Sequence, residues 1–346
     1  MRIAIVNDLM LARTVLRRVV ESVPGYEVAW EAENGAVAVE KARRDRPDVI
    51  LMDLLMPVMD GAEATRQIMQ FSPCPILVVT ASVRTNHRKV YEALGAGGLD
   101  AVRTPSVGPG GQLVDAEPLL QRLEKLVRLS GQAPERSNAT VTVEVSPSSD
   151  RHQRDDTPRL IALGASTGGP EALSRVLKGI GSGVPAIIVA VQHIGADYCV
   201  GLAEWLSEQV GFTVRIPRDG HRLEIGDVLL AGGDQHLIVD GDGCCRYQWE
   251  PRENYYFPSV DVFFQSLSAN WLTPGIAVLL SGMGSDGARG LLKLRQGGWH
   301  TIAQDEATSV VDGMPRAARE IQAAVEVLPV DAIGMACRSR IVKLSR

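Results

Sequence analysis

Three segments in the C-terminal half of the sequence carry residue types that could form a nucleophilic catalytic site. Gly164-Ala-Ser-Thr-Gly168 has the G-x-S-x-G pattern, in which a sharp turn between a strand and a helix exposes a serine hydroxyl. His193 directly follows an apolar strand pattern, and Asp286 lies in a glycine-rich segment. A serine nucleophile needs a general base, and the base needs a group that orients it. Ser166, His193 and Asp286 are therefore candidates for these three roles in a hydrolase.

Each of these residues taken alone also has a structural explanation. The glycines around Ser166 suit a turn that packs a helix against a strand or binds phosphate at a helix N-terminus. A single histidine such as His193 is more often a structural residue, and the Asp-Gly pair at Asp286 is first a turn signal. Three such residues at the ends of three strands favour a site. Their order, Ser…His…Asp, differs from that of α/β-hydrolases, so that fold is not implied.

A second set of polar residues lies in the N-terminal half. Asp8 follows the first apolar run, Asp53 ends the third and Thr80 ends the fourth. Two carboxylates at one sheet edge could hold Mg²⁺, with waters completing the octahedron, and the metal would offset the charge of an acyl phosphate. Thr80 could donate a hydrogen bond to a phosphoryl oxygen. Alone, Asp8 could instead cap a helix and Asp53 could begin a turn.

The elements that must position the N-terminal residues alternate between strand and helix patterns. Expected strands are 2–6, 27–31, 49–52, 76–79 and 99–102, and expected helices are 11–23, 36–44, 62–71, 86–94 and 116–129. Strict alternation with apolar strands predicts a parallel sheet covered by helices on both faces. Ligands of such sheets bind at the carboxyl ends of the strands.

The C-terminal half begins in the same way. Expected strands are 159–163, 186–191 and 275–280, a helix begins near residue 171, and another covers 288–295. Turn signals between short apolar segments over residues 212–249 predict a few antiparallel strands. We expect a second, more irregular α/β domain with a mainly parallel sheet.

Composition indicates a soluble protein of two domains. The chain has 346 residues, 45% hydrophobic and 22% charged, with a net charge of −5, which disfavours general disorder and nucleic-acid binding through bulk basicity. We find no membrane-span pattern, no signal-peptide pattern and no C-x-x-C spacing, and therefore expect a cytoplasmic protein. Residues 130–158 are rich in Ser, Pro, Asp and Arg. We interpret them as a linker between domains at 1–129 and 159–346.

The N-terminal half resembles the receiver domains of two-component systems. Residues 49–61 read Val-Ile-Leu-Met-Asp-Leu-Leu-Met-Pro-Val-Met-Asp-Gly, as in the phosphoacceptor segment of that family, and Asp8, Thr80 and residues 100–105 match it too. The resemblance implies a doubly wound, flavodoxin-like sheet of strand order 2-1-3-4-5. It also implies phosphorylation of Asp53, Mg²⁺ bound with the help of Asp8 and Asp53, and Thr80 as a switch residue.

Two positions depart from the receiver pattern. Asn7 stands where receivers usually have the first of two adjacent acids, and Thr104 stands where they have a lysine before a proline. Arg103 is adjacent, but successive strand side chains point to opposite faces. The missing lysine removes a cation that would sense the phosphoryl charge. We therefore expect phosphorylation of Asp53, with switching through Thr80 and Thr104 altered from the usual mechanism.

The C-terminal half resembles the catalytic domain of chemotaxis-type protein-glutamate methylesterases, the CheB family. The matching segments are Leu-Gly-Ala-Ser-Thr-Gly-Gly-Pro at 163–170, Val-Gln-His-Ile at 191–194, Pro-Ser-Val-Asp-Val-Phe at 258–263, Leu-Ser-Gly-Met-Gly-Ser-Asp-Gly at 280–287 and Ala-Gln-Asp-Glu-Ala-Thr-Ser at 303–309. The resemblance implies that Ser166 is the nucleophile, His193 the base and Asp286 its orienting acid. It also implies that Thr167 and Met283 lie beside the oxyanion site.

This resemblance implies a function as well. The family hydrolyses glutamate methyl esters, and selected glutamine amides, on the cytoplasmic helices of methyl-accepting chemoreceptors. It needs no cofactor for this reaction, and a CheA-type histidine kinase phosphorylates the receiver. The implied partners are therefore chemoreceptors and such a kinase, with no nucleic acid and no membrane insertion. We expect the unphosphorylated receiver to restrain the esterase. The opening Ile-Val-Asn-Asp and the missing lysine resemble the WspF-type, surface-sensing branch.

Two other functions remain as alternatives. A non-catalytic adaptor, controlled by phosphorylation, would bind receptors or a kinase without chemistry. A Rossmann-like nucleotide binder would use residues 164–169, but that segment lacks the third glycine of G-x-G-x-x-G spacing.

Overall fold

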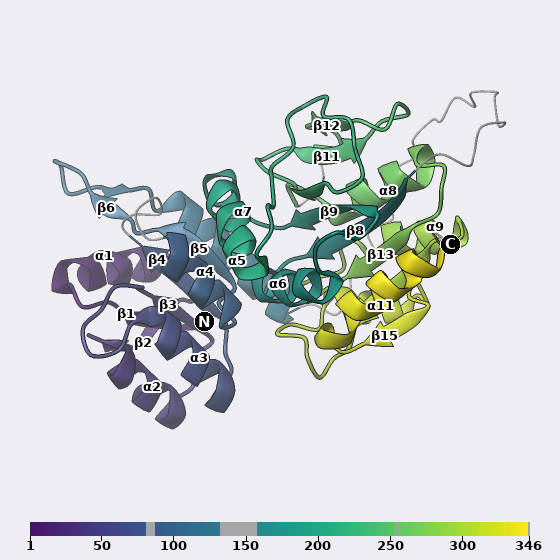
Figure 1. Ribbon diagram of the computed structural model, residues 1–346. Helices are drawn as coiled ribbons and strands as arrows, with labels where there is room; N and C mark the ends of the chain where they lie inside the picture. Colours follow the sequence, from purple (N-terminus) through teal and green to yellow (C-terminus); the bar gives the residue numbers. More distant parts are fainter. Residues whose placement is uncertain (81–86, 132–157, 253, 255, 345–346) are drawn as a thin grey trace. The chain divides into compact units, whose positions relative to one another are not determined.

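The computed structural model describes residues 1–80, 87–131, 158–252, 254 and 256–344. The chain forms two compact units, Met1–Gly131 and Gln132–Arg346, which are described separately below (Figure 1). Most of the linker expected at 130–158 lies outside the described residues. Within the described part of the chain, no helix has the length and apolar character needed to cross a membrane.

The first unit is a five-stranded parallel sheet with the strand order β2-β1-β3-β4-β5 (Figure 1), which confirms the expected fold. Its strands are β1 (Arg2–Val6), β2 (Glu27–Ala32), β3 (Val49–Met52), β4 (Ile76–Thr80) and β5 (Asp100–Arg103), followed by the antiparallel pair β6 (Ser106–Val107) and β7 (Leu113–Val114). Its helices are α1 (Met10–Glu21), α2 (Gly35–Arg44), α3 (Gly61–Phe71), α4 (His87–Gly95) and α5 (Glu117–Gly131).

Strand register brings the polar residues of this unit to one edge. β1 and β3 are parallel, with Val6 opposite Met52, so the residues that follow each strand lie side by side. The Asp53 N–H donates to the Val6 carbonyl at 2.9 Å, which continues the pairing past the end of β3. Both strands are apolar and buried on both faces, where two separate hydrophobic clusters cover the sheet. The polar residues that follow these strands therefore lie at the carboxyl edge of the sheet and not on its faces.

The second unit contains a six-stranded sheet with the order β10-β9-β8-β13-β14-β15, in which every pair is parallel. Its strands are β8 (Arg159–Ala165), β9 (Ala186–Gln192), β10 (Val228–Leu230), β13 (Ile276–Leu279), β14 (His300–Gln304) and β15 (Glu326–Leu328), and β11 (His236–Val239) pairs with β12 (Cys245–Gln248) outside it. Its helices are α6 (Gly169–Ile180), α7 (Ala196–Val210), α8 (Val260–Asn270), α9 (Ala288–Gln296), α10 (Met314–Glu320) and α11 (Val330–Leu344).

The prediction for residues 212–249 was wrong in part. β11 and β12 are antiparallel, as expected, but β10 joins the main sheet parallel to β9. The reason is that β10 extends an apolar edge, with Leu229 and Leu230 buried against β9 and its neighbours, and this burial outweighs the local turn signals.

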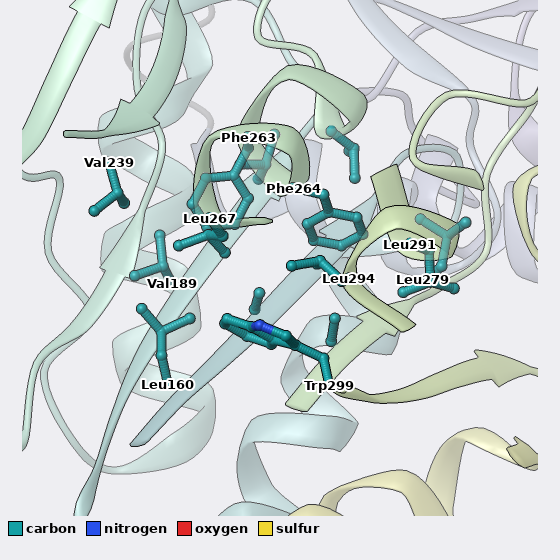
Figure 2. Packing of buried hydrophobic residues seen from close by; sticks show 14 of the residues in the cluster. Leu160, Val189, Val239, Phe263, Phe264, Leu267, Leu279, Leu291, Leu294 and Trp299 are labelled. Carbon is teal, nitrogen blue, oxygen red and sulfur yellow. The ribbon is translucent and has the colours of Figure 1, made fainter. Parts of the chain in front are cut away.

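Hydrophobic packing fixes α8 in place over the sheet. Figure 2 shows Phe263, Phe264 and Leu267 of α8 packed with Leu291 and Leu294 of α9 and with side chains of the sheet, and these residues are fully buried. Burial of each such side chain contributes roughly 1.5–3 kcal/mol. This packing holds the N-terminus of α8 in position relative to the sheet.

Candidate active sites

The serine segment is a tight turn between β8 and α6. The Ser166 N–H donates to the Ser281 carbonyl at 3.0 Å, and its carbonyl accepts from the Gly169 N–H at 2.8 Å. Gly168 has φ +74°, a left-handed conformation that glycine adopts without strain, and it lets the chain reverse into α6. The turn is also held by Gln192, whose Nε2 donates to the Ser166 carbonyl at 2.7 Å.

Parallel register brings the three expected segments to one edge. Ala165 lies opposite Gln192, and Gly164 lies opposite Leu279, so Ser166, His193 and residues 280–287 follow three adjacent strands. A Cβ added to Gly282 would lie 2.8 Å from the Ser166 Cβ, which shows how closely these segments approach.

His193 and Asp286 form a buried pair. The His193 Nε2 lies 2.8 Å from the Asp286 Oδ2, and the two side chains are only 8% and 4% exposed. Nδ1 of the same ring is buried and has no hydrogen-bond partner among the described residues, so it makes no bond to the Ser166 hydroxyl. The ring stacks on Tyr256, with centroids 4.3 Å apart and planes at 10°. His193 is thus held by its edge and by its face, with one ring nitrogen unused.

The side chain of Asp286, from the loop before α9, lies against the N-terminus of α8 and accepts three further hydrogen bonds there. Its Oδ1 accepts from the Ser259 hydroxyl at 2.8 Å and from the Asp261 N–H at 3.1 Å, and its Oδ2 accepts from the Val260 N–H at 2.7 Å. Burial acts to raise the pKa of Asp286, but the hydrogen bond and charge of His193, together with Ser259 and Val260, lower it below the ordinary value. The arrangement favours an ionised carboxylate.

Burial and the nearby Asp286 charge have the opposite effect on Asp261, whose pKa they raise to about 7. Asp261 also accepts from the Gly290 N–H at 2.6 Å, which links α8 to the start of α9. The two carboxyl groups are therefore shifted in opposite directions, with the pKa of Asp286 lowered and that of Asp261 raised.

Thr167 and Met283 lie on the two loops that flank Ser166. Thr167 is buried, and its carbonyl accepts from the Ser281 hydroxyl at 2.7 Å. The Met283 carbonyl accepts from the Tyr256 hydroxyl at 3.5 Å. These bonds engage carbonyl groups and hold the backbone of each loop in a fixed orientation.

In the first unit, Asp53 lies next to Asn7 and Asp8. The Asn7 Nδ2 donates to the Asp53 Oδ2 at 2.9 Å, and the Leu54 N–H donates to the Asp53 Oδ1 at 2.7 Å. Burial raises the pKa of Asp53 to about 6, with a further contribution from the charge of Asp8 and an opposing one from the Leu54 N–H. The residue that replaces the first acid is therefore a hydrogen-bond donor to Asp53.

The expected switch residues lie at the ends of two neighbouring strands. Thr80 is buried at the end of β4, and its carbonyl accepts from the Thr104 N–H at 3.0 Å. Arg103 is exposed.

Several residues of these sites were not identified from the sequence. Tyr256 stacks on His193, Ser259 binds Asp286, and Gln192 supports the Ser166 turn. Gln192 and Ser259 lie in segments that resemble the family, where their proximity to His193 and to the start of an apolar helix was the available signal. Nothing in the sequence around Tyr256 indicates that its ring lies on His193.

Comparisons with known proteins agree with both units. The family model described as CheB methylesterase matches residues 161–337, and that described as response regulator receiver domain matches residues 3–106. The second unit is similar to the crystal structure of the Thermotoga maritima CheB methylesterase catalytic domain, with a TM-score of 0.50 and 32% identity over 54% of this chain and 99% of that one.

Curated relatives match nearly the whole chain. A Pseudomonas putida protein named protein-glutamate methylesterase/protein-glutamine glutaminase of group 3 operon is 46% identical and covers 96% of this chain and 97% of its own length. A protein-glutamate methylesterase/protein-glutamine glutaminase of Mesorhizobium japonicum is 47% identical, over 99% of this chain and 98% of its own length. The chain therefore belongs to the CheB methylesterase family, with a response regulator receiver domain ahead of the catalytic domain.

Proposed function

We propose that this chain hydrolyses glutamate methyl esters, and selected glutamine amides, on the cytoplasmic helices of methyl-accepting chemoreceptors, with Ser166, His193 and Asp286 as the catalytic triad. The single observation that carries the proposal is the bonding of His193. Because Asp286 is ionised, it accepts a proton-bearing nitrogen, and Nε2 is therefore the protonated one. The lone pair of His193 then lies on the buried, unpartnered Nδ1, as a general base requires.

The proposed reaction begins when the Nδ1 of His193 takes the Ser166 proton as Oγ bonds to the carbonyl carbon of the ester. The carbonyl oxygen becomes an oxyanion, which the main-chain N–H groups of Thr167 and Met283 stabilise; such donors contribute about 3–4 kcal/mol each. The bond to the methoxy group then breaks, and that group leaves as methanol with the proton from His193. Asp286 stabilises the charged imidazole throughout.

Water completes the reaction. His193 takes a proton from the water as its oxygen attacks the acyl carbon, and the same proton returns to Ser166 when the acyl bond breaks. The product is a glutamate side chain, and an amide substrate releases ammonia in place of methanol. The groups of this chain supply every proton transfer in this sequence, so it runs without a cofactor.

For the receiver, we propose that a CheA-type histidine kinase phosphorylates Asp53 and that Asp8 and Asp53 hold Mg²⁺. The donor set fits, because one or two carboxylates with waters are a usual Mg²⁺ site. The raised pKa of Asp53, caused by burial and by the charge of Asp8, supports the proposal, because a bound cation would offset unfavourable negative charge there. Mg²⁺ would neutralise the phosphoryl charge. Asn7 would hold one oxygen of Asp53.

Methanol release from membranes that carry methylated receptors tests the esterase proposal. We expect release by the wild-type chain and its loss in Ser166→Ala, with Ser182→Ala as a matched control, because Ser182 is exposed after the end of α6. Equal release by Ser166→Ala and wild type would exclude the triad. No release by wild type, together with phosphorylation-dependent receptor binding, would support the non-catalytic adaptor instead.

A further inference from the structure

A second histidine, His236, is fully buried close to the proposed triad. It is the first residue of β11 and has 0% of its surface exposed. Its Nδ1 lies 3.1 Å from the Ser259 backbone nitrogen, and its Nε2 lies 3.3 Å from the Pro251 carbonyl oxygen. The ring also stacks on Phe257, with centroids 4.4 Å apart and planes at 22°. Both ring nitrogens and one ring face are therefore engaged, by Pro251, Ser259 and Phe257.

These partners determine which nitrogen of His236 carries the proton. A backbone N–H can only donate, so Nδ1 must be the unprotonated acceptor; a carbonyl can only accept, so Nε2 must carry the hydrogen. Burial lowers the pKa of His236, in agreement with a neutral ring. A protonated Nδ1 would face the Ser259 N–H, donor against donor. The site thus requires a side chain that offers an acceptor at the position of Nδ1.

Ser259 connects this histidine to the carboxylate of Asp286. Its N–H is bound by His236, while its single hydroxyl proton is donated to Asp286 at 2.8 Å. The same hydroxyl accepts from the Val262 N–H and caps α8. The next residue, Val260, donates its N–H to Asp286 as well. A shift of Ser259 would therefore displace donors to both carboxylate oxygens.

We propose that His236 is a positioning residue for the esterase reaction, which holds Ser259 and, through it, orients the Asp286 carboxylate toward His193. It touches no reacting atom. The inference rests on the proposed function, since it assigns His236 to the orientation of that triad.

Three variants of the full chain separate this role from a purely structural one. In His236→Asn the amide oxygen replaces Nδ1 and can accept from Ser259, in His236→Gln the amide nitrogen can replace Nε2 toward Pro251, and His236→Leu offers neither bond. We expect His236→Asn to keep kcat within about threefold of wild type. We expect His236→Leu and His236→Gln to lower kcat by about 10- to 100-fold, with little change in KM, as small displacements of catalytic groups do.

Methanol release gives kcat and KM, and circular dichroism at the assay temperature confirms that each variant is folded. A folded His236→Leu with wild-type kcat would overturn the proposal. If His236→Leu does not fold, equal kcat values for the Asn and Gln variants overturn it instead. Failure of the proposed function is distinct, because the wild-type chain would then show no Ser166-dependent release at all.

Discussion

Asp286 holds His193 through Nε2, the ring nitrogen farther from the main chain, at 2.8 Å. The nitrogen nearer the main chain, Nδ1, is consequently the one left without a hydrogen-bond partner among the described residues. His193 follows β9 directly and its N–H donates to the Ala165 carbonyl at 3.1 Å, so the base of its side chain lies beside the Ser166 turn. This geometry explains why the nearer nitrogen is the one proposed to act on the serine.

Asp286→Asn is expected to lower kcat by about 10³- to 10⁴-fold. Four donors face the two carboxylate oxygens, so an amide NH₂ in either position would face two of them. If the NH₂ takes the place of Oδ2, it faces the His193 Nε2 and favours the tautomer of His193 that carries its proton on Nδ1. Methanol release measures the effect, and Asp331→Asn, which alters only an exposed pair with Arg175, serves as the control. A kcat for Asp286→Asn within tenfold of wild type would contradict the orienting role.

Tyr256→Leu is expected to lower kcat by up to about tenfold, because a stacked aromatic pair contributes roughly 0.5–1.5 kcal/mol beyond its buried area. Its ring covers one face of His193 at a centroid distance of 4.3 Å. Tyr256→Phe keeps the ring and removes the hydroxyl with its bond to the Met283 carbonyl, so it should retain most of the activity. Steady-state kinetics on both variants checks this, and equal losses in the two would show that the hydroxyl, not the stack, matters.

Gly169→Ala is expected to lower kcat clearly while it lowers the thermal midpoint only modestly. An added Cβ would lie 1.9 Å from the Oε1 of the buried Gln192, so the amide group that donates to the Ser166 carbonyl would have to shift. The thermal midpoint should fall modestly, whereas the serine turn should lose its support. Gly241→Ala is the matched control, because no atom lies within 4 Å of its Cβ position, and surface changes of that kind alter stability by about 0.5 kcal/mol or less. An unchanged kcat in Gly169→Ala would show that support of the Ser166 turn by Gln192 does not affect the reaction.

The sequence predicted the positions of site residues better than their contacts. The sequence correctly placed four residues at strand ends, namely Asp8, Asp53, Ser166 and His193. Buried parallel strands are recognisable from their apolar runs, and parallel pairing brings the residues that follow adjacent strands to one edge of the sheet. The ring nitrogen that faces Asp286 could not be predicted, since it depends on rotamers fixed by tertiary packing. The stack of Tyr256 on His193 is of the same kind, because it joins segments 63 residues apart in sequence whose meeting no local pattern encodes.

Asp53 is expected to make the receiver less stable as pH rises from about 4 to about 6 in metal-free buffer. Its pKa is raised to about 6, mainly by burial, from an ordinary value of 3.8. Between those values the folded state binds more protons than the unfolded state, so the free energy of unfolding decreases with pH, by up to about 3 kcal/mol in total. Above pH 6 both states are ionised and the loss is constant.

Asp53→Asn removes this titration, so the variant should match wild type near pH 4 and exceed its unfolding free energy near pH 7. Scanning calorimetry of both full-length chains at the two pH values measures the difference. Added Mg²⁺ should stabilise wild type at pH 7, because a cation bound by Asp8 and Asp53 favours the folded state, and it should act far less on Asp53→Asn. A stability difference between the two chains that is the same at pH 4 and pH 7 would show that burial does not hold the Asp53 proton, and a Mg²⁺ effect of equal size in both would place the metal elsewhere.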